Sequence, residues 1–111
     1  MNLYEVHCEV KAKDAKCEMP LDVKRAFVSV FVPARTIVKA LDGAKAVLKE
    51  DHFLITEMDR CMKINLDAWE SYRDEFFGED SSELPSRAEA ENALEQCLAF
   101  HGPFYIDEGN G

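Results

Sequence analysis

Residues 26–32 form a short run that is apolar on both of its faces. The run is rich in valine and phenylalanine, which favour strands, and it stops at Pro33, which cannot donate a ladder hydrogen bond. Because side chains alternate along a strand, the valines share one face, and Phe27 and Phe31 share the other. Such a strand has to be covered on both sides, so we predict a central strand of a sheet.

The neighbouring segments change between the strand period of two and the helical period of about 3.6 residues. Strands are predicted at residues 3–13, 26–32, 52–56, 58–66 and 104–106. A turn at Asp59 and Arg60 is predicted between the third and fourth of these strands, with a bend in one long strand as the alternative. Helices are predicted at 36–50, at 68–77 between an Asp67 cap and Gly78, and from a capping box at Ser86 and Glu89 to about His101.

This order of elements predicts a single α+β domain over residues 1–106, followed by a loose tail at 107–111. We expect a two-layer sandwich, in which an antiparallel or mixed sheet of about four strands carries two main helices on one face. A ferredoxin-like arrangement is the nearest common architecture. Gly43 weakens the first helix by about 1 kcal/mol relative to alanine, which indicates a close approach to the sheet.

The net charge of the chain is −9 and is distributed unevenly. Residues 1–50 hold seven acids and nine bases, whereas residues 51–111 hold fifteen acids and four bases. We therefore expect neither nucleic acid nor anionic membrane as a partner, because phosphate binding requires clustered lysine and arginine. We expect a cytoplasmic protein, since residues 1–5 show no basic or apolar leader and no apolar run is long enough to span a bilayer.

The cysteines and glycines form no pattern typical of a metal, redox or phosphate site. The four cysteines are scattered, without a C-x-x-C pair or a zinc-type spacing to histidine. The glycine-rich motifs that cradle phosphate groups are absent as well. We therefore predict no catalytic residue, no metal and no cofactor.

An alternative function is that of a small enzyme or a small-ligand-binding protein on a ferredoxin-like dimer. Glu5, His7 and Glu9 share one face of the first predicted strand, and an imidazole between carboxylates is suited to general acid–base chemistry. A solvated strand face explains the same residues. The residues expected to carry this alternative are His7, Glu57, Asp59 and Arg60.

Residues 74–83 form an acidic stretch that contains two phenylalanines. We predict that this stretch binds a basic protein, with aromatic side chains as anchors and carboxylates that steer the encounter. An inhibitor or immunity-type protein that blocks a basic enzyme would have such a charge distribution, and a merely solubilising surface is the alternative. The predicted partner-binding residues are Glu75, Phe76, Glu79, Asp80 and Glu83.

Phe27 and Phe31 need a cover on the second face of the central strand. A second copy of the same sheet is the simplest cover, so we predict these two residues as the interface of a homodimer. The alternative is that the chain covers them itself, with the helix at 68–77 or with the tail.

Overall fold

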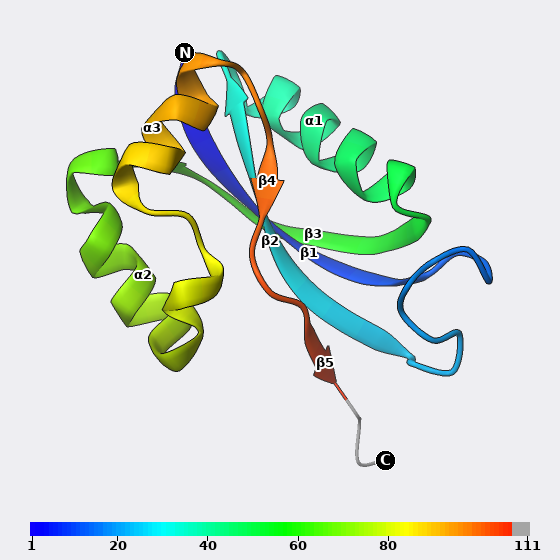
Figure 1. Ribbon diagram of the computed structural model, residues 1–111. Coiled ribbons are helices and arrows are strands. Elements are labelled where there is room, and N and C mark those ends of the chain that lie inside the picture. Colours follow the sequence, from blue (N-terminus) through cyan, green and yellow to red (C-terminus); the bar gives the residue numbers. More distant parts are fainter. Residues whose placement is uncertain (108–111) are drawn as a thin grey trace.

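Five strands form one antiparallel sheet (Figure 1), namely β1 (Asn2–Ala12), β2 (Arg25–Ala34), β3 (Phe53–Ile64), β4 (Phe100–His101) and β5 (Tyr105–Asp107). This computed structural model describes residues 1–107. The strand order is β3-β1-β2-β4, and β5 pairs with β2 further along the same edge as β4. Strands β1 and β2 therefore lie inside the sheet, and the long strand β3 forms one of its edges.

Three α-helices and two short 3-10 helices complete the fold, namely α1 (Ile37–Glu50), η1 (Leu66–Ala68), α2 (Trp69–Phe77), η2 (Gly78–Glu83) and α3 (Arg87–Glu95). Helix α1 packs on one face of the sheet, whereas α2 and α3 pack on the opposite face (Figure 1). The α+β class and the antiparallel sheet are confirmed. The expected two layers are wrong, because β2 is apolar on both faces and each face is covered by its own helices.

Each sheet face has its own hydrophobic core. The core beneath α1 is mostly aliphatic and includes Val6, Val28 and Leu48. The core beneath α2 and α3 is aromatic, with Phe31 and Trp69 at its centre. The ferredoxin-like arrangement is not confirmed, because it requires the order β-α-β-β-α-β and this chain begins with a β-β hairpin.

The predicted strands at 3–13 and 26–32 are confirmed as β1 and β2. The two strands predicted at 52–56 and 58–66 are a single strand, β3, so the turn at Asp59 and Arg60 is wrong and the alternative of a bent long strand is right. Two register shifts against β1 interrupt the alternation of side chains in β3. Each shift leaves one extra residue in β3, as a β-bulge does, and therefore breaks the period of two in the same way as a turn.

Local capping determines where α1 and α2 begin and end. The Thr36 side chain accepts a hydrogen bond from the backbone of Lys39 and begins α1. Gly78 ends α2 as predicted, with a φ of 50° that favours glycine. The Asp67 cap is wrong: this residue lies in η1, and the side chain of Asn65 accepts from its backbone N–H.

The capping box of α3 is confirmed, since the Ser86 hydroxyl accepts from the backbone of Glu89 and the Glu89 carboxylate accepts from the backbone of Ser86. The helix is shorter than predicted and ends at Glu95. Cys97 has a φ of 57°, which turns the chain out of the helical path. His101, predicted as the last helical residue, instead pairs with β2 in β4.

Gly43 lies where α1 approaches β2 most closely, as its place in the helix indicated. A methyl group at this position would lie 2.5 Å from Cγ1 of Val32. We expect Gly43→Ala to destabilise the protein by about 1–2 kcal/mol, because overpacking outweighs the gain in helix propensity. The free energy of unfolding in urea measures the effect.

A double variant that combines Gly43→Ala with Val32→Ala distinguishes steric crowding from helix propensity. The double variant should recover part of the loss caused by Gly43→Ala, since the smaller side chain removes the clash. Strictly additive losses in the two single variants would contradict the crowding argument.

The end of the described chain runs along β2. The strand predicted at 104–106 is confirmed as β5, and Asp107, which was assigned to the loose tail, is its last residue. The rest of the predicted tail, 108–111, lies outside the described residues. Within residues 1–107, none of the helices has the length and apolar character required to cross a bilayer.

Candidate functional site

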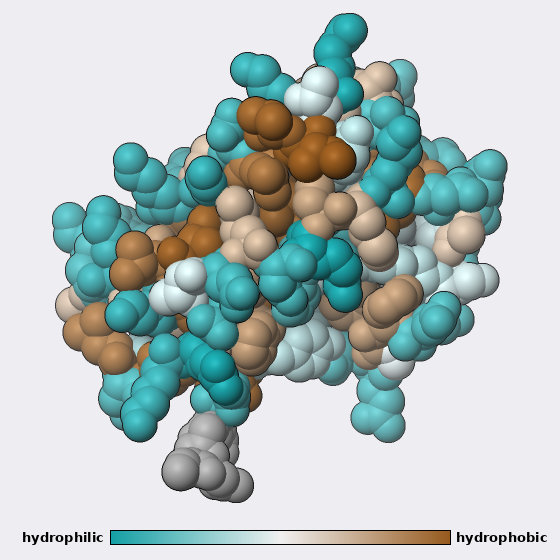
Figure 2. Space-filling view, turned by 180° about the vertical axis from the view of Figure 1, so that it is seen from behind, coloured by the Kyte–Doolittle hydropathy of each residue, from teal (hydrophilic) through white to brown (hydrophobic). Residues whose placement is uncertain are grey.

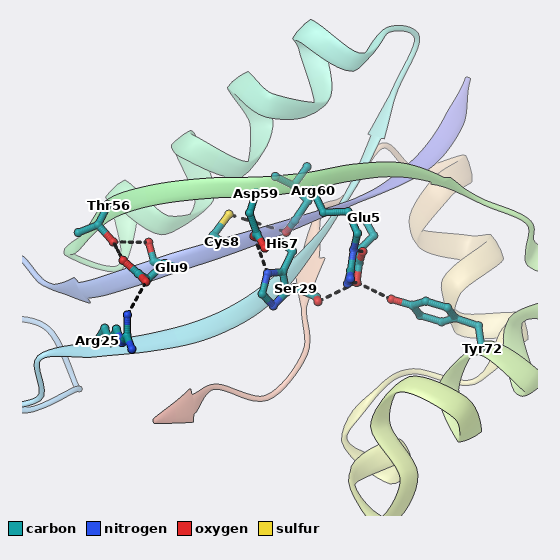
Figure 3. Close-up of polar contacts among 11 residues, drawn as sticks. Glu5, His7, Cys8, Glu9, Arg25, Ser29, Thr56, Asp59, Arg60 and Tyr72 are labelled. Carbon is teal, nitrogen blue, oxygen red and sulfur yellow. Dashed lines mark hydrogen bonds and ion pairs between the residues drawn. The ribbon is translucent and has the colours of Figure 1, made fainter. Parts of the chain in front are cut away.

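Polar side chains occupy the part of the second sheet face beyond the aromatic core. Helices α2 and α3 pack over the end of this face that carries Leu3, Phe31 and Ile64. Beyond that end, three neighbouring strands present the group that we call the polar face (Figure 3). The polar face consists of Glu5, His7 and Glu9 on β1, Arg25, Phe27 and Ser29 on β2, and Thr56, Asp59 and Arg60 on β3.

The two bulges of β3 supply the polar face with residues that regular alternation would turn away. Asp59 is an extra residue next to the pair formed by His7 and Arg60, and Thr56 is extra at the second shift. Asp59 and Arg60, although consecutive, therefore both contact side chains of β1 on the same face. The extra residue at the first shift therefore places the Asp59 carboxylate beside His7 and Arg60.

Glu5 is the centre of a buried network. Its side chain has no exposed surface. Arg60 donates to both of its oxygens from Nε at 2.9 Å and Nη2 at 3.0 Å, Ser29 donates at 2.8 Å and Tyr72 at 2.7 Å. The network joins β1, β2 and β3 to α2, so it holds α2 on the sheet.

Opposing effects act on the ionisation of this network. Burial alone would raise the pKa of Glu5, but the hydrogen bonds from Arg60, Tyr72 and Ser29 together with the Arg60 charge outweigh it and lower the pKa. Burial raises the pKa of Tyr72, and its hydrogen bond to Glu5 raises it further. Glu5 is therefore an anion whose lone pairs are already engaged by protein donors, which suits structure rather than acid–base catalysis.

His7 and Asp59 form a second pair beside this network. Nδ1 of His7 lies 2.6 Å from Oδ1 of Asp59, and the imidazole stacks on Phe27 with ring centroids 5.9 Å apart. The hydrogen bond from His7 lowers the pKa of Asp59. A carboxylate that orients an imidazole is one component of a general base, but the hydrogen bond found for His7 goes to this carboxylate and not to a hydroxyl or thiol nucleophile.

The far end of the polar face is also occupied by paired groups. Thr56 donates to the Glu9 carboxylate at 2.5 Å, and Arg25 lies 3.4 Å from the same carboxylate. Arg25 also binds Asp107 of β5 at 2.6 Å. Glu57, the remaining residue of the enzyme alternative, is exposed on β3, and no hydrogen bond or ion pair within residues 1–107 joins it to His7.

The predicted partner-binding residues lie on α2 and η2, which we call the acidic surface. Phe76 exposes 50% of its surface, and the Arg60 guanidinium lies 5.8 Å from its ring centroid. Asp80 accepts a hydrogen bond from Tyr105 of β5. Glu75, Glu79 and Glu83 are exposed. In the view from behind (Figure 2), hydrophobic side chains gather mainly in the upper centre of the face, with hydrophilic ones around them.

The two phenylalanines predicted for a homodimer have different surroundings. Phe31 has no exposed surface and packs against Trp69, Tyr72 and Phe100, so the chain itself covers it. Phe27 is half-buried beneath His7 on the polar face. Phe31 is thus not available to a second copy in this structure, and any self-association on this face would rest on Phe27.

A cavity of about 660 Å³ lies beside the core beneath α1, on the sheet face opposite the polar face. It is bordered by the connection between β1 and β2, by the end of α1 and by the segment that joins β4 to β5. None of the residues of the enzyme alternative lines it. Its lining residues His52, His101 and Phe104 are not among the predicted site residues, because only the tertiary fold brings segments about 50 residues apart in sequence to one cavity.

Neither a metal site within residues 1–107 nor a related protein is found for this chain. No group of three or more potential metal ligands occurs among the described residues. No family model, no curated protein and no solved structure matches the chain.

Proposed function

We propose that this chain is an acidic protein-interaction domain whose acidic surface binds a basic protein partner. The observation that carries the proposal is Phe76, a large aromatic side chain that is half-exposed among the carboxylates of α2 and η2. Exposed aromatic residues are frequent anchors of interfaces, and surrounding charges accelerate the encounter with an opposite surface. The same distribution would suit an inhibitor or immunity-type protein that blocks a basic enzyme in the cytoplasm.

The acidic surface is held in place before any partner binds. Tyr72 of α2 donates to the buried Glu5, and Tyr105 of β5 donates to Asp80 of η2. Trp69, at the start of α2, donates to the backbone of Pro85. An ordered surface loses less conformational freedom on binding, which favours affinity.

Charge reversal tests the proposal. Glu75→Lys, Glu79→Lys and Glu83→Lys combined should slow association with a captured basic protein by about 10-fold or more at low salt, because steering is lost. The measurement is the association rate constant by surface plasmon resonance over a series of salt concentrations.

The matched control changes the same amount of charge elsewhere. Asp22→Lys, Asp42→Lys and Glu95→Lys combined alter exposed residues outside the acidic surface. An equal slowing in both triple variants would mean that only net charge matters and would refute a specific surface. If the protein captures only neutral or acidic proteins at low salt, the proposal fails entirely.

The variant Phe76→Ala tests whether Phe76 anchors the interface with the partner. The dissociation rate constant of the complex should rise by about 30-fold, the effect expected from loss of an interface hot spot of about 2 kcal/mol. Leu98→Ala, which truncates another exposed apolar residue, should leave that rate unchanged.

A homodimer through Phe27 is a separate part of the proposal. The half-buried ring lies on the polar face, where a second copy could cover it. Light scattering at micromolar concentration distinguishes the two states. A monomer mass would refute self-association and leave the proposal for the acidic surface unaffected.

A further inference from the structure

The cavity described above has an aromatic floor. Phe53 and Phe104 stack with ring centroids 4.8 Å apart and planes inclined by 14°, and His101 meets Phe104 edge-on at 5.1 Å. Met19 and Ile106 extend the apolar lining. A volume of about 660 Å³ is within the range of about 300–1,000 Å³ that small-molecule sites occupy.

The rim of the cavity is mainly negative. Glu18, Glu50 and Asp51 line it, and Lys16 is the one lysine among the lining residues. Glu50 and Asp51 also mark the carbonyl end of α1, where the helix dipole adds negative potential. An aromatic floor below a negative rim attracts cations, since ring faces and carboxylates both favour positive charge.

His52 occupies a backbone position in which glycine would be less strained. Its φ is 63°, and its N–H donates to the carbonyl of Lys49 to close the end of α1. Helices usually end with glycine in this left-handed conformation, because a Cβ is disfavoured there. The imidazole lines the cavity. Its Nδ1 lies 3.5 Å from Oδ2 of Asp14, and this pair holds the ring beside the cavity.

We propose that this cavity binds a small organic cation with an apolar or aromatic body. The apolar body would pack against the stacked pair of Phe53 and Phe104, and the positive group would face the carboxylates of the rim. The site is formed by elements other than α2 and η2, and none of its lining residues belongs to the acidic surface. A failure here would leave the proposed protein partner untouched, and the reverse holds as well.

The probe for this site is benzyltrimethylammonium, which combines a phenyl ring with a fixed positive charge. Titration into the full chain, followed by heteronuclear NMR, should give saturable binding with a Kd on the order of 0.1–1 mM. The shifted resonances should include those of His52, Phe53 and Phe104. Phenylacetate, of similar size and opposite charge, and neutral benzyl alcohol should bind at least about 5-fold more weakly.

Variants of the floor and the rim separate the two contributions. Phe104→Ala should weaken binding of the cation by about 10-fold, because the stacked floor is lost. Asp51→Asn should weaken it by about 3-fold. The control Glu57→Gln removes an exposed carboxylate that does not line the cavity and should leave the Kd unchanged.

His52→Gly separates binding from folding. We expect a higher or equal melting temperature, because the strained backbone is relieved, together with a weaker Kd for the cation. Saturable binding of phenylacetate as tight as that of the cation would overturn the proposal. Absence of saturation, or shifts confined to residues outside the cavity, would overturn it too.

Discussion

Replacing Glu5 with glutamine is expected to lower the free energy of unfolding by about 3 kcal/mol. The glutamine would be isosteric but neutral, so Arg60 would lose its buried counter-ion. The side-chain NH2 of the glutamine would also face hydrogen-bond donors, since Ser29, Tyr72 and Arg60 all donate to the Glu5 carboxylate. Urea unfolding followed by circular dichroism measures the loss.

Glu9→Gln is the matched control for this prediction. Glu9 lies four residues further along β1, on the same strand face, but its ion pair with Arg25 is at the surface, where Arg25 is half-exposed. Its replacement should change the free energy of unfolding by less than about 1 kcal/mol. Equal stability of the Glu5→Gln variant and the unaltered protein would show that the network does not hold α2 on the sheet.

The same network should make stability depend on pH in the acidic range. The pKa of Glu5 in the folded protein is lowered, so the unfolded chain binds a proton more readily than the folded one. The stabilisation is therefore complete above the ordinary glutamate pKa and is lost as the pH falls through the lowered value. Urea midpoints between about pH 6 and pH 2 should fall less steeply for Glu5→Gln than for the unaltered protein.

Phe31→Ala is expected to lower the free energy of unfolding by about 3–5 kcal/mol, the usual result of emptying a buried aromatic site. Phe31 contacts three rings of the aromatic core, with centroids 5.5 Å away at Trp69 and 4.9 Å away at Phe100. Its removal would leave a cavity between the sheet and α2. Thermal unfolding by calorimetry, supported by urea titration, measures the effect.

Phe76→Ala serves as the control, because the same change is made on a side chain of α2 that is half-exposed. A loss below about 1 kcal/mol is expected there. If the stability of the Phe31→Ala variant matched that of the unaltered protein, Phe31 would not be part of the core. A stability that rose with protein concentration would instead indicate cover by a second copy.

Elements whose cause is local were predictable from the sequence. The apolar run at 26–32 specified β2, the helical period placed the start of α1 near Thr36, and the capping box at Ser86 marked the beginning of α3. Gly43 indicated its contact with the sheet because a glycine in a helix needs a reason beyond propensity. These signals depend on neighbouring residues along the chain, so no knowledge of the fold was needed.

The candidate sites were less predictable. His7 and Glu5 were recognised as neighbours on one strand face, but their partners Tyr72 and Ser29 were not, because those side chains arrive from other elements. The sequence predicts a turn at Asp59, since a bulge and a turn interrupt alternation in the same way. The cavity at His52 joins three distant segments and leaves no periodic signal at all.

The sequence by itself determined that β2 must be covered on both faces, that the chain is α+β, and that its acidity lies after residue 50. The tertiary structure decided which helices provide the cover. It thereby determined that Phe31 and Glu5 are buried and that Phe76 is exposed. The physical reason is the range of the forces involved. Periodicity and capping act within a few residues, whereas burial and charge pairing depend on whichever segments the fold brings together.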